Sequence, residues 1–525
     1  MDLTSLYFLS FVLISCIIYY IVPRKAQWIV LLVSSLVFYA LSSGRLIFYL
    51  LVVTAIVYIG ALWLDFNERS FRGREAGLEK AARKEARKQH KKAQKVKVVF
   101  LSIAALGSLV VLKYSALGVE VASFALDLFD ASNSIAYTRF ALPLGISYFS
   151  LMAISYLIDV YRGKVSVEKN PFRVLLFTCY YPHITEGPFD RFHDLSDQFS
   201  SVHTFDFDLF CNGWILILFG YFKKIVIADR LGITVSEIFH HVDDYSGSAI
   251  ALASILYTFQ LYCDFSGCID LVSGVSELYG IKLAENFRQP FFSRSINEFW
   301  RRWHITLGLW LKEYVYYPVV LSGHFKAVDK YARKHLKSQN LINLVPSAYA
   351  LFFVWFTNGL WHGASVHYIA YGLYYYLLMM LGELLKPLAL KADEKLHFLG
   401  NRFYSLFQVL RTFLIVNTGM LLFRSTSVGE FFSLLQKAWS SFHYFVGMKE
   451  FFFFSREIVF ALLALLVLLV VSFVREKVAP VSVRDLLSKK PVLRYLLILA
   501  LVTYILTFGI YGPGFDSADF VYAQF

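Results

Sequence analysis

The chain has 525 residues, of which 57% are hydrophobic and 17% are charged, and its mean hydropathy is +0.55. Soluble proteins average about 45–50% apolar and about 25% charged residues, so this composition predicts an integral membrane protein and excludes the disordered and collagen-like classes. The net charge is +13. We expect no nucleic-acid partner, because most of this charge comes from residues 68–97, where twelve Lys or Arg accompany four Glu.

Four apolar segments lie near the start of the chain, and the basic stretch 68–97 separates the third from the fourth. Most approach the roughly 20 residues that a membrane span needs, and they cover residues 6–22, 28–41, 46–64 and 98–112. Cytoplasmic loops collect Lys and Arg, so we expect the loop 68–97 to be cytoplasmic and the N-terminus extracytoplasmic. The loop's composition favours a solvated helix or a flexible loop, which the anionic headgroups of the lipid bilayer would attract.

Ten further apolar segments follow, at residues 142–158, 174–181, 214–228, 249–262, 306–320, 348–360, 368–381, 403–423, 458–474 and 493–510. Several are too short to cross a membrane. Such segments are tolerated at membrane depth only where protein or water satisfies their backbone, so we expect re-entrant segments around an internal cavity. The pattern predicts an all-α polytopic protein of the cell membrane with about 10–12 membrane-embedded helices, some of them tilted or re-entrant.

Ionisable residues gather between residues 260 and 318, although a charged residue at the centre of a span costs about 2.5–3.5 kcal/mol. They are Asp264, Asp270, Glu285, Arg294, Glu298, Arg301, Arg302, His304 and Glu313. From Ile296 onward the 3.6-residue period predicts a helix, whose apolar face holds His304 together with Trp300, Trp303, Leu307, Leu311 and Tyr314. A histidine on such a face is either a hydrogen-bonded core residue or a catalytic base.

A second polar position, His362, lies between Gly359 and Gly363 in an apolar segment. If this segment is helical, Asn358 and Ser365 share a face with His362. The two glycines permit the close approach of another helix or of a substrate, and both alternatives stay open. We expect no metal site, because the histidines of this chain show neither HxxxH nor HExxH spacing and no third ligand is evident. The five cysteines form no CxxC pair and indicate neither a disulfide framework nor a thiolate zinc site.

These stretches contain a series of motifs in a fixed order: Asp264-Phe265-Ser266-Gly267, Glu285-Asn286-Phe287, Ser293-Arg294-Ser295-Ile296, Glu298-Phe299-Trp300-Arg301-Arg302-Trp303-His304 and Gly359-Leu360-Trp361-His362-Gly363. The series resembles the membrane-bound O-acyltransferase superfamily, in particular its bacterial branch of alginate O-acetyltransferases. The resemblance implies a single membrane domain over residues 1–525, in which helices surround a central catalytic funnel and residues 260–382 form the catalytic core region.

The resemblance also implies roles for individual residues. His362 is expected to be the catalytic residue and His304 the second active-site histidine. We expect substrate contacts from side chains near these two, namely Asn358, Trp361, Trp303, Arg302, Asp264 and Ser365. An imidazole there would take the proton of an attacking hydroxyl as it adds to a thioester, and would return the proton to the leaving thiolate.

By the same resemblance, the donor is cytoplasmic acetyl-CoA, which binds as a substrate while no cofactor is held permanently. The final acceptor is a cell-surface polysaccharide, reached through an extracytoplasmic acetyltransferase partner protein. Residues 368–374 look closer to the D-alanyl branch of the superfamily. D-alanyl transfer from a carrier protein to teichoic acid is therefore the alternative. An alternative of another class is a transporter or flippase, in which the buried charges would line a substrate path.

Overall fold

The computed structural model of this protein describes residues 1–127, 140–397, 399–443, 456–477, 490–511 and 520. These residues form helices and no strand, and their one isolated β-bridge joins Phe287 to Trp303. Nine helical stretches within the described ranges are long and apolar enough to cross a membrane, which confirms an all-α polytopic membrane protein. The helices belong to two compact units, each of which is described by itself.

Unit 1 consists of Met1–Trp214 and Val272–Ala284. Its α-helices are α1 (Leu6–Ile21), α2 (Gln27–Ser43), α3 (Ile47–Glu75), α4 (Lys80–Asp127), α5 (Ile146–Arg162), α6 (Pro171–Cys179), α7 (Tyr181–Ile184) and α8 (Phe192–Ser200), with short 3-10 turns at Arg24–Ala26 and Gly44–Leu46. α5 is the core of this unit, because nearly all of its residues are buried and it packs against α3, α4 and α6.

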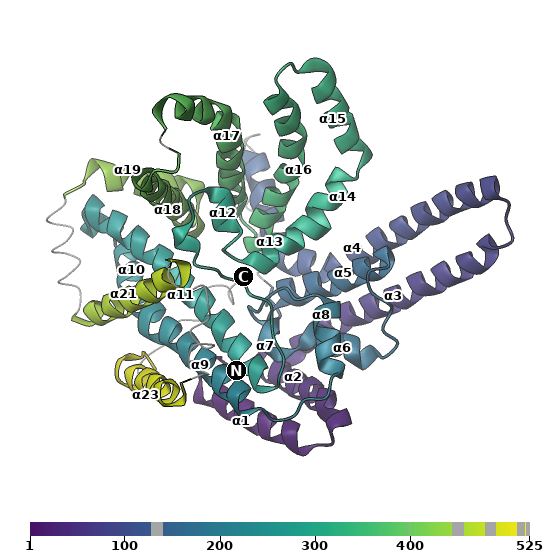
Figure 1. The fold of residues 1–525 in the computed structure, drawn as a ribbon, viewed down its shortest axis with the longest axis horizontal. Coiled ribbons are helices and arrows are strands. Elements are labelled where there is room, and N and C mark those ends of the chain that lie inside the picture. Colours follow the sequence, from purple (N-terminus) through teal and green to yellow (C-terminus); the bar gives the residue numbers. More distant parts are fainter. Residues whose placement is uncertain (128–139, 398, 444–455, 478–489, 512–519, 521–525) are drawn as a thin grey trace. The chain divides into compact units, whose positions relative to one another are not determined.

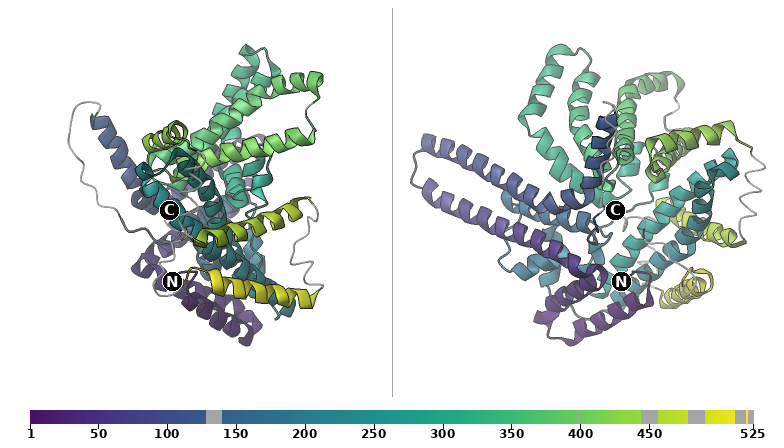
Figure 2. Two further views of the ribbon diagram at one scale, coloured as in Figure 1. Left: turned by 90° about the vertical axis from the view of Figure 1, so that its left-hand side faces the viewer. Right: turned by 180° about the vertical axis from the view of Figure 1, so that it is seen from behind.

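α3 and α4 form a long antiparallel hairpin, whose distant end extends away from the other helices of unit 1 (Figure 1, Figure 2). α4 has 48 residues, which corresponds to a length of about 70 Å. Of the two alternatives that the composition of residues 68–97 left open, the structure shows a helix: only the short link 76–79 between α3 and α4 is not helical.

Unit 2 consists of Ile215–Leu271 and Glu285–Phe525, and the helices α9 (Phe207–Tyr221) and α11 (Gly247–Leu278) contribute residues to both units. Its other α-helices are α10 (Asp229–His240), α12 (Ile296–Trp300), α13 (Ile305–Leu311), α14 (Tyr317–Val320), α15 (Gly323–His335), α16 (Gln339–His362), α17 (Val366–Leu396), α18 (Arg402–Arg424), α19 (Val428–Ser440), α21 (Arg456–Lys477) and α23 (Pro491–Phe508). Two π-helical turns, η3 (Phe222–Ala228) and η6 (Lys312–Tyr316), interrupt the regular helix, and 3-10 turns lie at η4 (Val242–Asp244) and η5 (Pro290–Phe292).

The turn η3 carries two buried lysines that bind acidic residues of unit 2. Lys224 Nζ lies 2.9 Å from Asp229 Oδ1 and 2.7 Å from Asp264 Oδ1, while Lys223 Nζ lies 2.6 Å from Asp270 Oδ2. A π-turn adds a residue to the helical repeat and is frequent at functional sites. Here it presents two consecutive lysines to the acidic residues of α10 and α11.

Every apolar segment expected from the sequence coincides at least in part with a helix, and most helices continue beyond the apolar residues into polar ones. The prediction of a continuous helix from Ile296 is wrong. α12 ends at Trp300, the next residues turn, and α13 begins at Ile305. The cause is a backbone pairing that holds this turn, described below.

Candidate active site

His304 lies in the turn between α12 and α13. α12 begins behind Ser295, whose hydroxyl accepts the backbone N–H of Glu298 at 3.2 Å. After this short helix the chain turns, and His304 itself has a φ of +48°. This left-handed conformation costs a residue other than glycine roughly 1–2 kcal/mol. The surrounding contacts must therefore outweigh the strain.

The segment 286–288 supplies those contacts by pairing with the turn. Two backbone bonds hold the pairing: Arg288 N–H donates to the Arg302 carbonyl (2.9 Å) and Ile305 N–H donates to the Asn286 carbonyl (3.0 Å). Between them Phe287 faces Trp303 in the β-bridge, and the indole of Trp303 is 1% exposed. This pairing fixes the register of the turn on both sides of His304.

The Asn286 side chain fixes the protonation of the His304 ring. His304 Nδ1 lies 3.1 Å from Asn286 Oδ1, and the same oxygen accepts the backbone N–H of Thr306 (3.1 Å) and its hydroxyl (2.9 Å). A backbone N–H is always a donor, so the amide atom that it meets is the oxygen. An amide oxygen only accepts, so His304 Nδ1 carries a proton. In the neutral ring Nε2 is then an acceptor.

His304 is also shielded from solvent. The residue is 2% exposed, its ring packs edge-on against Phe265 with a centroid distance of 4.8 Å, and it lies 5.5 Å from the indole of Trp361. Burial lowers the pKa of His304 to about 3, because an apolar environment disfavours the charged imidazolium. The ring is therefore neutral at neutral pH and Nε2 is available as a base.

His362 is the last residue of α16 and is 2% exposed. Three aromatic residues surround its ring, with centroid distances of 4.8 Å to Trp361, 5.4 Å to Tyr371 and 5.2 Å to Phe423. The contacts to Tyr371 and Phe423 are edge-on, at 89° in both cases. The imidazole is thus held in an apolar setting by α17 and α18.

The glycines beside His362 make room for α17 rather than for an open substrate path. A Cβ on Gly359 would lie 2.4 Å from the carbonyl oxygen of Tyr368, and one on Gly363 would lie 2.2 Å from the Tyr368 ring. Of the two alternatives for these glycines, close helix packing is the one that the structure supports. The contact brings Tyr371, one turn further along α17, against His362.

Trp361 connects the two histidines. Its indole contacts both the ring of His304 and the ring of the adjacent His362, although 58 positions separate the two histidines in the sequence. Trp361 is 7% exposed. The structure thus brings together two buried imidazoles that sequence reasoning selected independently.

Asn358 and Trp303 are buried close to the histidines. Asn358 is 4% exposed and lies one helical turn before His362 in α16, as predicted. Trp303 stacks on Phe299 at 5.4 Å and belongs to the turn that holds His304. Both positions are compatible with the expected substrate contacts.

Ser365 departs from its expected geometry. α16 ends at His362, and Ser365 is the N-cap of α17, so it does not share a helical face with His362. Its hydroxyl lies 3.0 Å from Nδ1 of His367. The prediction of a shared face fails because Gly363, with extended backbone at φ −178°, ends the helix first.

Asp264 and Arg302 have protein partners in the structure. Asp264 binds Lys224, and Arg302 binds Glu298 at 2.6 Å and Glu476 at 2.7 Å. These ion pairs give both side chains a structural role, since they join segments distant in the sequence. Their expected role as substrate contacts stays a prediction.

Sequence reasoning did not select four of the residues that surround the histidines: Asn286, Phe265, Tyr371 and Phe423. Asn286 and Phe265 belong to motifs that carry the family resemblance, and that membership was the available signal. Among the described residues no group of three His, Cys, Asp or Glu side chains is arranged to hold a metal ion.

Comparison with known proteins shows which family part of this chain resembles. Residues 106–333 match the model of the membrane-bound O-acyltransferase family, a region that includes His304 and ends before His362. The chain is 36% identical over 319 residues to a probable alginate O-acetylase of Pseudomonas syringae pv. tomato, a match that covers 60% of this chain and 55% of that protein.

Two other relatives are more distant. A peptidoglycan O-acetyltransferase of Helicobacter pylori is 32% identical over 258 residues, which is 44% of this chain and 46% of the relative. A teichoic acid D-alanyltransferase of Bacillus subtilis is 28% identical over 287 residues, which is 53% of this chain and 68% of the relative. The chain thus spans about half the length of the alginate O-acetylase and peptidoglycan O-acetyltransferase that it matches.

Proposed function

We propose that this chain, which belongs to the membrane-bound O-acyltransferase family, transfers acetyl groups from acetyl-CoA for the O-acetylation of a cell-surface polysaccharide. The observation that carries the proposal is the position of two buried imidazoles, His304 and His362, against the same indole in a polytopic membrane protein. The similar proteins support the reaction class, because they are a probable alginate O-acetylase, a peptidoglycan O-acetyltransferase and a teichoic acid D-alanyltransferase.

In this proposal His362 is the general base. Its imidazole takes the proton of the attacking hydroxyl while the hydroxyl oxygen forms a bond to the thioester carbonyl carbon. The carbon–sulfur bond then breaks, and the proton passes from the imidazolium to the leaving thiolate. The apolar setting of Tyr371 and Phe423 keeps water away from this exchange.

His304 serves a different purpose. Its Nδ1 donates to Asn286, so neutral His304 presents an acceptor at Nε2 and cannot donate a hydrogen bond to the developing oxyanion. We therefore assign it the orientation of the acceptor molecule: Nε2 accepts a hydrogen bond from a second hydroxyl of that molecule, because the single proton of the attacking hydroxyl goes to His362. The amide of Asn358, buried one turn before His362, is the donor that we propose for the oxyanion.

The remaining parts of the proposal follow from the family. The catalytic core region covers residues 260–382 of a single membrane domain, and no cofactor is held permanently. Acetyl-CoA enters from the cytoplasm, on the side of the basic segment 68–97, while the N-terminus lies outside. A partner acetyltransferase on the extracytoplasmic side completes the transfer to the polysaccharide.

A donor experiment tests the proposal. Purified protein in lipid receives radiolabelled acetyl-CoA, and we expect slow release of CoA or transfer of label to an added acceptor. His362→Ala should reduce both by at least about 100-fold, the usual contribution of general base catalysis. His367→Ala is the matched control, since this histidine is also buried but lies on α17 and bonds Ser365.

Three outcomes would contradict the proposal in different ways. Equal activity of the His362→Ala variant would remove the mechanism. A response only to a D-alanyl carrier protein would favour the activity of the Bacillus subtilis relative. Movement of a glycan or lipid across vesicles without any acyl transfer would indicate a transporter.

A further inference from the structure

The polar end of the α3–α4 hairpin carries a row of lysines on one face of α4. At 100° per residue the six positions fall within an arc of about 120°. All six side chains are exposed, and the row extends over about 22 Å. We call this row the lysine stripe; it consists of Lys80, Lys84, Lys88, Lys91, Lys92 and Lys95.

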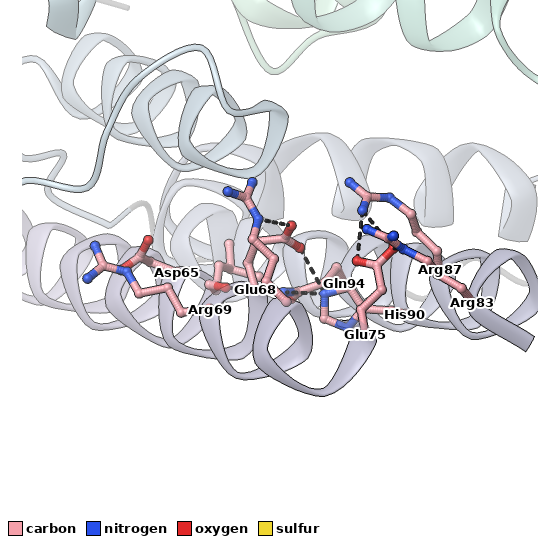
Figure 3. Close-up of polar contacts among 10 residues, drawn as sticks. Asp65, Glu68, Arg69, Glu75, Arg83, Arg87, His90 and Gln94 are labelled. Atoms are coloured by element: carbon pink, nitrogen blue, oxygen red, sulfur yellow. Dashed lines mark hydrogen bonds and ion pairs between the residues drawn. The ribbon is translucent and has the colours of Figure 1, made fainter. Parts of the chain in front are cut away.

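Contacts between the helices use a neighbouring face of α4. Glu75 of α3 is 3% exposed and binds Arg83 at 2.9 Å and Arg87 at 2.8 Å. His90 stacks on Phe71, with ring centroids 4.0 Å apart and an angle of 6°. Figure 3 shows the side chains of Arg83 and Arg87 on α4 meeting the carboxylate of Glu75 on α3. Arg83 and Arg87 therefore join the two helices of the hairpin, whereas the lysines of the stripe lie beside this contact and are exposed.

Further along the same contact, His90 Nε2 lies 2.9 Å from Glu68, and Gln94 Nε2 donates to the Leu64 carbonyl at 3.1 Å (Figure 3). By comparison, few acidic side chains compensate the positive charges of the lysine stripe. Within the described part of the chain its ion pairs comprise one weak contact, Lys88 to Glu85 at 4.0 Å. Glu85 is also the one acidic residue between positions 80 and 97.

The lysine stripe begins where the apolar surface of the hairpin ends. Phe66 on α3 is 70% exposed and Val96 on α4 is 63% exposed. From this point toward the other end of the hairpin both helices are apolar. Lys97 lies 4.5 Å from the ring of Trp63. Tryptophan and lysine are typical of the membrane–water boundary. The boundary on this hairpin therefore lies near residues 63–66 and 96–97.

α4 is one unbroken helix without proline from the lysine stripe to its apolar part. The stripe therefore extends from the boundary toward the distant end of the hairpin. Lys80 lies about 24 Å from Val96 along the helix axis. Charges in solution are screened over roughly 8 Å at physiological salt. In a hairpin that leaves the membrane along its own axis, the distant half of the stripe is therefore too far from lipid headgroups to be neutralised by them.

We propose that the lysine stripe is a docking surface for a soluble protein with an acidic face, on the side of the membrane where the hairpin emerges. Apart from the adjacent pair Lys91 and Lys92, the lysines recur every three or four residues along one helix, which matches a partner helix with Asp or Glu at the same interval. Complementary charge of this kind speeds association and selects the partner. This inference is independent of the proposed acyl transfer.

Binding of a defined probe tests the charge complementarity. The full chain is placed in nanodiscs of zwitterionic lipid, and a fluorescent helical peptide of about 20 residues, with Glu along one face, is titrated in. We expect anisotropy to report binding that weakens steeply between about 0.05 M and about 0.3 M salt. Replacing all six lysines of the stripe with Gln should weaken binding at least about 10-fold.

Two further variants test whether peptide binding depends on the positions of the six lysines or on the total charge of the protein. The control variant replaces six exposed lysines of unit 2 with Gln: Lys326, Lys330, Lys334, Lys337, Lys391 and Lys395. The relocation variant keeps composition and net charge but moves three lysines off the stripe, by Lys84→Ala with Ala82→Lys, Lys91→Gln with Gln89→Lys, and Lys92→Ala with Ala93→Lys. We expect wild-type affinity for the control and weaker binding for the relocation variant.

Other results would overturn the proposal. Equal affinity of the relocation variant and the wild type would show attraction by net charge alone. An equal loss in the control variant would show the same. Binding of the lysine stripe to vesicles that contain phosphatidylglycerol, as tight as binding to the peptide, would assign the stripe to a lipid surface. Absence of peptide binding would remove the proposal directly.

Discussion

The Nδ1 atom of His304 lies 3.1 Å from the Oδ1 atom of Asn286, across a backbone pairing that joins the segments carrying the two residues. Thr306 donates twice to the same oxygen, so the orientation of the amide is fixed by groups outside the histidine. Asn286 is therefore a positioning residue: it acts on the reaction by keeping the proton on Nδ1 and the lone pair on Nε2.

The first prediction concerns this pair and rests on the proposed acyl transfer. Asn286→Asp places a carboxylate beside the Nδ1 proton of His304, which favours the imidazolium and raises a pKa that burial holds at about 3. The protonated ring has no lone pair at Nε2, so activity should fall at low pH and return as the pH rises through the new pKa. The measurement is the pH dependence of kcat, in which the acid limb should move upward.

Two variants check that explanation. Asn286→Leu removes the acceptor without adding charge, so we expect a loss of about 10-fold or more that does not depend on pH. Thr306→Val keeps the backbone donor to Asn286 and should retain most activity. A pH profile of Asn286→Asp that coincides with that of the wild type would contradict the positioning role.

The sequence predicts this site only in part, for a physical reason. Apolar periodicity located most helices, the polar residues within apolar stretches pointed to both histidines, and motif resemblance assigned their roles. The left-handed conformation of His304 was not predictable, because residues 296–314 satisfy a helical period equally well without the turn. The pairing with Asn286 is a tertiary contact that outweighs the local preference of residues 296–314 for a continuous helix. The expectation that Ser365 shares a helical face with His362 failed similarly, because the end of a helix at Gly363 depends on packing against α17.

The second prediction concerns the close packing of α16 and α17. Gly359→Ala would place a Cβ 2.4 Å from the carbonyl oxygen of Tyr368, and backbone cannot move aside cheaply. We expect a destabilisation of about 1–3 kcal/mol or more and loss of activity through displacement of the segment before His362. The measurement is the melting temperature in detergent, followed by tryptophan fluorescence.

Gly382→Ala is the matched control for this substitution. It lies inside α17, and a Cβ there meets no atom within 4 Å. Alanine favours a helix over glycine by roughly 0.5–1 kcal/mol, so this variant should melt at the same or a higher temperature. Similar destabilisation of both variants would show that the close contact at Gly359 is not the cause.

The third prediction concerns the buried charges of η3. Lys224→Met leaves Asp229 and Asp264 buried without their lysine, which should cost about 3–5 kcal/mol. Asp264→Asn should cost less, because Lys224 keeps Asp229 as a partner. Combining Lys224→Met with Asp229→Asn and Asp264→Asn removes all three charges and should restore part of the stability. Melting temperatures of the four proteins measure this, and a triple variant less stable than Lys224→Met alone would contradict it.

The last prediction concerns the side of the membrane on which the hairpin emerges. The five native cysteines all lie in the described part of the chain, are buried and form no disulfide, and their replacement gives a background for labelling with a membrane-impermeant thiol reagent. A cysteine at Lys84, which is exposed on α4, should react only after cells are opened, because segments rich in Lys and Arg remain cytoplasmic. A cysteine at Arg45, in the turn between α2 and α3, should react in intact cells. Both variants should label fully after denaturation, which controls for local burial. Reaction of the Lys84 position in intact cells would place the hairpin outside, on the side opposite to cytoplasmic acetyl-CoA, and an acidic partner of the lysine stripe would then have to be extracytoplasmic.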